Sequence, residues 1–124
     1  MRVKKVVMGS EGSIDSVQFL LSDGLIEHDL KAVGDRQFNH AYNVPENDEI
    51  KCIRFGITYN DPYWKFTSMQ FVTKNGVSSE VYAGTFRINQ YQVICLDNDD
   101  DDHFIGFHGH YGSTFDSIGF NIMK

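Results

Sequence analysis

Carboxylates are concentrated in one short run of this 124-residue sequence, Asp97-Asn98-Asp99-Asp100-Asp101-Asp102. Oxygen-rich loops can hold Ca²⁺, so Asp99, Asp100, Asp101 and Asp102 are candidate ligands for this ion. The run lacks the glycine and the terminal glutamate of an EF-hand loop, however. We therefore expect a solvated acidic loop and no required cofactor, and we keep a Ca²⁺ site as the alternative.

Three histidines, His103, His108 and His110, follow within eight residues. On a strand, His108 and His110 share a face and form a candidate metal pair, but we expect structural or surface roles for all three. The sequence contains no nucleophile elbow, no phosphate-binding loop and no H-E-x-x-H motif. No pair of carboxylates has a spacing that places an acid opposite a base for glycoside hydrolysis. We therefore expect no catalytic residues and no enzyme activity.

The two cysteines, Cys52 and Cys95, each lie in an apolar run typical of a strand. We expect two buried free thiols, with a disulfide, or a redox or metal role, as the alternatives. The N-terminus shows no signal-peptide pattern, so we expect a reducing, cytoplasmic compartment. No apolar run approaches the length of a membrane span. The net charge of −6 argues against non-specific nucleic-acid binding, which needs a basic surface.

The elements that position these residues are strands, because apolar residues alternate with period two and no helical period is sustained. Asp23-Gly24 and Asn75-Gly76 are candidates for type I′ hairpin turns, and Pro45-Glu46-Asn47-Asp48 is a further turn. We expect irregular structure at residues 29–43. Many short strands separated by turns predict one all-β domain over residues 1–124. The alternating segments are 17–21, 53–59, 69–73, 77–81 and 118–122.

A six-residue pattern occurs three times along the chain. The copies begin at residues 14, 66 and 115, so they lie 52 and 49 residues apart, which is typical of a repeated supersecondary unit. Three such units, each too small to bury its own apolar face, are expected to pack around a shared pseudo-threefold axis. The copies are Ile14-Asp15-Ser16-Val17-Gln18-Phe19, Phe66-Thr67-Ser68-Met69-Gln70-Phe71 and Phe115-Asp116-Ser117-Ile118-Gly119-Phe120.

Residues 104–120 contain the pattern G-x-x-x-D-x-I-G, which begins at Gly112 and has its acidic residue at Asp116. This stretch resembles the C-terminal strand pair of the jacalin-related lectins. Residues 14–19 and 71–76 resemble the first-repeat strand and a hairpin of the same family. The resemblance implies a β-prism of three Greek-key sheets with pseudo-threefold symmetry, and a carbohydrate-binding function.

The resemblance also implies a sugar site at one end of the prism. Asp116 would accept hydrogen bonds from sugar hydroxyls, and such charge-assisted bonds are the stronger kind. The backbone N–H groups that precede it would donate to the same hydroxyls, and Gly112 would let the sugar approach the main chain closely. Tyr63 and Trp64 would offer aromatic faces to the apolar C–H patches of a pyranose. The implied ligand-binding residues are Gly112, Ser113, Thr114, Phe115, Asp116, Tyr63 and Trp64.

Two features depart from the family pattern. The family usually has ten or more residues ahead of the strand matched by residues 3–7, including a Gly-Gly pair that lines the site, whereas this sequence begins at that strand. We therefore expect one wall of the site, and one strand, to be missing. Glu11 stands where a second G-x-x-x-D motif, ending at Asp15, would need glycine, so we expect no second site.

The expected partners are mannose/glucose-type or galactose-type glycans. The alternative is a β-prism that serves as a protein-interaction or assembly domain, as in a homo-oligomer, with a degenerate sugar site. An exposed sheet edge can serve as a template for pairing with another chain, which is the physical basis of this alternative.

Overall fold

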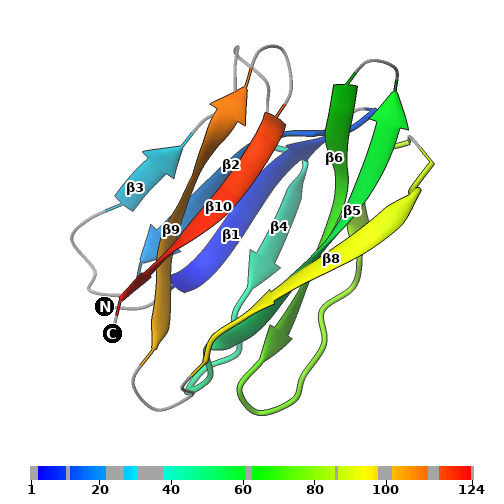
Figure 1. Cartoon of the computed structure of the whole chain (residues 1–124). Helices are drawn as coiled ribbons and strands as arrows, with labels where there is room; N and C mark the ends of the chain where they lie inside the picture. Colours follow the sequence, from blue (N-terminus) through cyan, green and yellow to red (C-terminus); the bar gives the residue numbers. More distant parts are fainter. Residues whose placement is uncertain are drawn as a thin grey trace.

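Figure 1 shows the computed structural model, in which every described element is a β-strand. The structure describes residues 3–10, 12–21, 27–30, 38–60, 63–85, 87–97, 102–111 and 115–123. The all-β prediction is therefore confirmed. None of the described segments is a helix that is long and apolar enough to cross a membrane.

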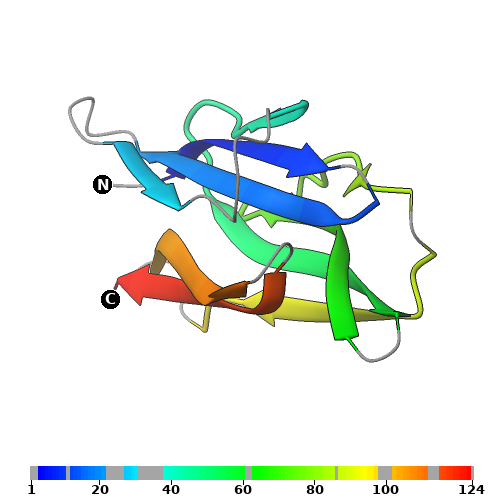
Figure 2. The ribbon, with the colours of Figure 1, turned by 90° about the horizontal axis from the view of Figure 1, so that it is seen from above.

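The strands form three antiparallel sheets, which Figure 2 shows arranged around a common interior. The first has the order β3-β2-β1-β4, built from Glu27–Leu30, Ile14–Leu21, Val3–Ser10 and His40–Asn43. The second has the order β7-β6-β5-β8, built from Tyr82–Ala83, Tyr63–Thr73, Ile50–Asn60 and Gln90–Cys95. The third pairs β9 (His103–Tyr111) with β10 (Phe115–Met123).

The first two sheets have Greek-key topology, because three strands follow one another and the fourth returns beside the first. The third sheet has two strands among the described residues, so the pseudo-threefold symmetry stays a prediction. The expectation of irregular structure at residues 29–43 is wrong in part, since β4 and the end of β3 fall within it. These strands are only four residues long, which is too short for period two to stand out.

Each copy of the six-residue pattern lies on the second strand of an antiparallel hairpin: β1–β2, β5–β6 or β9–β10. In every hairpin the register shifts at the second residue of the copy. Asp15, Thr67 and Asp116 are therefore the extra residues of three β-bulges at equivalent positions. The flanking pairs are Ser10 with Ile14 and Gly9 with Ser16, Ile57 with Phe66 and Gly56 with Ser68, and Tyr111 with Phe115 and His110 with Ser117.

The hydrophobic core receives side chains from all three sheets. Phe19 and Phe71, which end the first two copies of the pattern, are fully buried, and burying such a side chain contributes about 1.5–3 kcal/mol. Tyr42 of β4 stacks on Phe71 of β6, with ring centroids 4.8 Å apart, so aromatic packing joins the first sheet to the second. The core residues are Val3, Val6, Met8, Ile14, Val17, Phe19, Tyr42, Ile50, Ile53, Phe55, Ile57, Met69, Phe71, Tyr82, Leu96 and Phe104.

The turn predictions met different outcomes. The turn at residues 45–48 is confirmed, because the Asp48 N–H donates to the Pro45 carbonyl over 3.1 Å. At Asn75-Gly76 the type I′ prediction is wrong. A β-turn closes with the Gly76 N–H donating to Thr73 O, and only the glycine has positive φ, at 85°. A type I′ turn needs positive φ at both central residues. Asp23-Gly24 lies outside the described residues.

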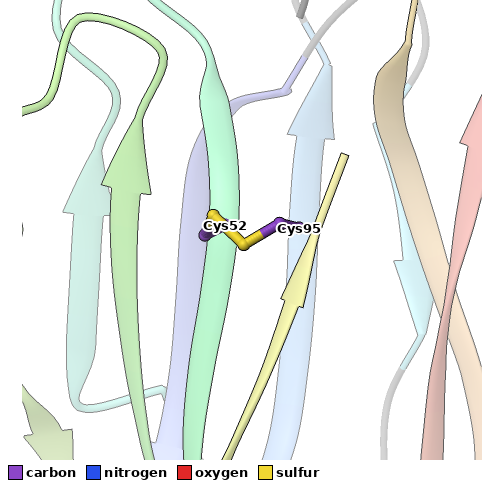
Figure 3. Close-up of a disulfide and its surroundings, with 2 residues drawn as sticks. All are labelled: Cys52 and Cys95. Carbon is purple, nitrogen blue, oxygen red and sulfur yellow. A yellow bond between two sulfur atoms is a disulfide. The ribbon is translucent and has the colours of Figure 1, made fainter. Parts of the chain in front are cut away.

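Cys52 and Cys95 form a disulfide between β5 and β8, as Figure 3 shows. The expectation of two buried free thiols is therefore wrong. The two residues are direct partners in the antiparallel register, and their Cα atoms are 4.1 Å apart. Directly opposed side chains share one face of a sheet, and here it is the outer face. The neighbouring apolar residues Ile53 and Leu96 are buried instead, which is why both sequence runs look like core.

Candidate functional site

The three hairpins turn at one end of the molecule, which lies at the top of Figure 1. We call it the hairpin end: β1, β5 and β9 finish there, and β2, β6 and β10 begin there. β8 finishes and β9 begins at the opposite end, on either side of the acidic run. Each of the three bulges lies near the hairpin end of its strand pair.

The structure brings the backbones of four sequence-predicted site residues to the hairpin end. Tyr63 and Trp64 begin β6, and Phe115 and Asp116 begin β10. Strands β6 and β10 also contact one another. Gly112, Ser113 and Thr114, which complete the predicted loop, lie outside the described residues.

The three bulge positions differ in chemistry. Two carry aspartate, Asp15 and Asp116, and the second carries Thr67, whose side chain is 0% exposed. The Thr67 hydroxyl has no hydrogen-bond partner, and the Gly84 N–H donates to the Thr67 carbonyl over 2.8 Å. The chain that follows β7 therefore lies against this bulge. At the other two bulges the extra residue is an aspartate, and bulges interrupt strand pairing.

Tyr59 is an aromatic residue at the hairpin end that sequence reasoning did not place in the site. Alternation put it on one face with Ile53 and Phe55, yet its side chain is exposed, and it is the backbone partner of Trp64. Asn89 holds this end of β5, since its Oδ1 accepts from the Tyr59 N–H over 3.1 Å. The signal in the sequence was an aromatic residue immediately before Asn60-Asp61-Pro62, a combination of residue types that is typical of turns.

A cluster of polar residues joins the first and second sheets at the hairpin end. The Asn39 amide bonds the Ser10 backbone twice: its Oδ1 accepts from the Ser10 N–H and its Nδ2 donates to Ser10 O, over 2.9 and 2.7 Å. The Ser10 hydroxyl lies 2.8 Å from His40 Nε2 and 3.4 Å from the Ala83 carbonyl oxygen. These contacts connect β1 to β4 and β7, so they fix the framework of the hairpin end.

At the opposite end a charged cluster fastens β9 to the second sheet. His103 Nδ1 lies 2.6 Å from Glu49 Oε2, and Lys74 Nζ lies 3.7 Å from the same oxygen. Lys74 also donates to the carbonyl of Asp102, a buried residue, over 3.1 Å. His103 thus has the structural role expected of it. Residues 99–101 lie outside the described residues, and no group of three metal-binding side chains occurs among those described. The expected solvated acidic loop and its alternative, a Ca²⁺ site, both stay predictions.

The sequence matches the family model of the jacalin-like lectin domain over residues 1–121. No curated protein matches the chain by sequence. Solved structures of jacalin-related lectins share its fold, however. Artocarpin in complex with mannotriose is 14% identical, with a TM-score of 0.76, over 100% of this chain and 85% of that one.

Two further structures agree. A mannose-binding jacalin-related lectin from Ananas comosus is 16% identical, with a TM-score of 0.72, over 99% of this chain and 83% of that one. A galactose-specific lectin from Artocarpus hirsuta, in complex with methyl α-D-galactose, is 13% identical, with a TM-score of 0.75, over 100% of this chain and 93% of that one. At these identities the structures establish the fold, while the family model covers nearly the whole chain: it belongs to the jacalin-like lectin domain family.

Proposed function

We propose that this chain is a carbohydrate-binding protein whose sugar site lies at the hairpin end. The observation that carries the proposal is the family match over residues 1–121 together with the G-x-x-x-D motif from Gly112 to Asp116. The Asp116 carboxylate accepts hydrogen bonds from two neighbouring hydroxyls of one pyranose, and the preceding backbone N–H groups donate to the same oxygens.

The bulge at Asp116 supports this assignment. As the extra residue between two ladder pairs, Asp116 has no direct partner on β9, so its backbone does not have to follow the alternation of the strand. Tyr63 and Trp64 begin β6, which contacts β10, and their rings form the apolar wall for the C–H face of the sugar. Tyr59 lies opposite Trp64 and adds exposed aromatic surface beside it.

The proposed ligands are pyranosides of the mannose/glucose or galactose type. Solved structures of related lectins contain mannotriose and methyl α-D-galactose, so both mannose-type and galactose-type glycosides should be tested first. Binding needs no cofactor in this proposal, because carboxylate, amide and aromatic groups supply all the contacts. Ca²⁺ and EDTA should therefore give the same sugar affinity.

The test uses Trp64, which is the only tryptophan of the chain. Its fluorescence is titrated with methyl α-mannoside, methyl α-glucoside and methyl α-galactoside. Asp116→Asn should weaken binding about tenfold or more, because a charge-assisted hydrogen bond contributes about 1.5–3 kcal/mol. Asp15→Asn is the matched control, since it changes the equivalent bulge of the first hairpin, and it should leave the titration unchanged. Binding that survives Asp116→Asn would overturn the site.

A further inference from the structure

The disulfide of the second sheet lies where a dissolved thiol can reach it. Cys52 and Cys95 are directly opposite one another on the outer face of the sheet, one on β5 and the other on β8 (Figure 3). Cys95 is exposed, whereas Cys52 is half-buried. Exposed disulfides are the ones that exchange most readily with external thiols. The two sulfur atoms are therefore candidates for chemistry as well as for cross-linking.

Access to the two sulfur atoms differs because of their places in the sheet. In thiol–disulfide exchange the incoming sulfur approaches the attacked sulfur along the extension of the bond that breaks. β8 is the last strand in the order β7-β6-β5-β8, and no residue in the described part of the chain pairs with its other side. The line that runs from Cys52 through Cys95 therefore continues over the edge of the sheet, from which the exposed Cys95 can be approached.

The approach to Cys52 from the opposite direction is covered. Val72 of β6 is the partner of Cys52 on the other side of β5, so its side chain lies on the same outer face. Ser78 continues the sheet beyond Val72 through an isolated bridge. A thiol that attacks Cys52 in line with the bond has to cross the Val72 side chain, so the geometry favours attack on Cys95.

The neighbouring charges favour the same direction of attack. Cys52 follows Lys51, and Arg54 lies two residues further along the same face of β5. Cys95, by contrast, is followed two residues later by the exposed Asp97. Positive charge stabilises a nearby thiolate, and the sulfur whose thiolate is more stable leaves faster in the exchange. Cys52 is therefore the better leaving group.

We propose that Cys95 is a site of reversible thiol–disulfide exchange with small soluble thiols, with Cys52 as the leaving group. The small thiolate attacks Cys95 Sγ and forms a new S–S bond to it. The Cys52–Cys95 bond breaks, and its electron pair leaves on Cys52 Sγ, which takes a proton from water. The small thiol is oxidised in this step and Cys52 is reduced. A second small thiol that attacks the small-molecule sulfur of the mixed disulfide leaves both cysteines as thiols.

The exchange is reversible because other contacts keep the two strands in register. β8 pairs with β5 along its whole length, and the Leu96 N–H donates to the Lys51 carbonyl over 2.9 Å just beyond the disulfide. Ile94 also packs against the core. These contacts hold Cys52 opposite Cys95 after the bond opens, so the Cys52 thiolate can expel the small thiol again. The ratio of thiol to disulfide around the protein then sets the fraction of chains that carry the cross-link.

The first test identifies the sulfur that receives the thiol. Folded protein without free thiols, as shown with Ellman's reagent, is incubated with reduced glutathione, and iodoacetamide traps the protein thiol that is released. Peptide mass spectrometry should find glutathione on Cys95 and the alkyl group on Cys52, in excess over the reverse isomer by about tenfold or more. The reverse isomer in equal or larger amount would overturn the proposal. So would a disulfide that does not react with glutathione in the folded protein, or cysteines that cannot be brought to the paired state.

Two matched variants test the geometric reason. Val72→Ala removes the side chain that covers the approach to Cys52, so the excess of the Cys95 isomer should fall about threefold or more. Val93→Ala is the control, because Val93 lies on the same outer face, two residues before Cys95, but not on the line of the bond. Its substitution should leave the isomer ratio unchanged. An unchanged ratio in Val72→Ala, or an equal change in both variants, would contradict the proposed direction of attack.

Discussion

The disulfide between β5 and β8 offers the sharpest prediction about stability. It joins residues 43 positions apart in sequence, so it closes a long loop in the unfolded chain and lowers the entropy of that state. The loop-closure relation gives about 4 kcal/mol of stabilisation for a loop of this length at 25 °C. Replacing both cysteines with serine, or reducing the bond, should therefore lower the free energy of unfolding by about that amount.

The corresponding shift in melting temperature follows from the size of the chain. For 124 residues the entropy of unfolding is about 260 cal/mol/K near the midpoint, so a loss of about 4 kcal/mol lowers the melting temperature by about 15 °C. The packing contribution to this shift is small, because Cys95 is exposed and Cys52 is half-buried.

Differential scanning calorimetry with and without a phosphine reductant measures this shift directly. The Cys52→Ser/Cys95→Ser double variant is the control: it should melt where the reduced natural protein melts, and the reductant should not change it. Mass spectrometry after thiol alkylation establishes which form is present. A melting temperature unchanged by confirmed reduction would refute the loop-closure reasoning, and two free thiols in protein purified without reductant would refute the pairing itself.

Two further predictions concern the core and the second sheet. Burial raises the pKa of the Tyr42 phenol above its ordinary value, and repulsion from Asp48 and Tyr82 adds to this effect. The free energy of unfolding should therefore be unaffected by this group below about pH 10, and it should decrease as the pH rises through the folded-state pKa. Tyr42→Phe removes a buried hydroxyl that has no hydrogen-bond partner, so it should raise the free energy of unfolding by about 1 kcal/mol and reduce the loss of stability at alkaline pH. Urea unfolding at pH 7 and above pH 10 measures both effects. Lower stability of the variant at pH 7 would show that the hydroxyl does have a hydrogen-bond partner. Gly56→Ala should lower the free energy of unfolding by about 1–3 kcal/mol in the same assay, because the new methyl group would collide with Ser68 Oγ. This oxygen accepts a hydrogen bond from the Gly56 N–H over 3.0 Å. An unchanged urea midpoint would contradict the tight packing around Gly56.

The repeated pattern could be recognised from sequence because it is local. Each copy contains its own bulge position, and the first two copies bury most of their apolar residues, so six residues are enough to mark the second strand of a hairpin. The structural role of the second residue of each copy was not apparent from the sequence. Asp15, Thr67 and Asp116 look like a loosely shared polar site in the sequence, and only the strand register shows that all three are bulged.

Sequence reasoning failed at two places in the second sheet. Alternation at residues 77–81 predicted a strand, but this segment forms only an isolated bridge, between Val72 and Ser78, and Val77 and Val81 are exposed. The disulfide was only an alternative in the sequence analysis because its pairing is long-range. β8 reaches β5 only after the chain has passed through β6 and β7, and no local pattern records that return.

The disulfide also bears on the expected compartment. Disulfides persist in oxidising environments and are rare in the reducing cytosol, whereas the sequence led us to expect the latter. The location of the protein stays a prediction, and the redox state of Cys52 and Cys95 in protein isolated from its source would decide it.

The central claim is that this jacalin-like domain binds a sugar through Asp116. Isothermal titration calorimetry with methyl α-mannoside and methyl α-galactoside tests it most directly, because it gives both affinity and stoichiometry. We predict saturable binding of one of the two glycosides with one site per chain, retained in Asp15→Asn and weakened about tenfold or more in Asp116→Asn. The absence of heat with either glycoside, or two sites per chain with one lost in each variant, would contradict the account.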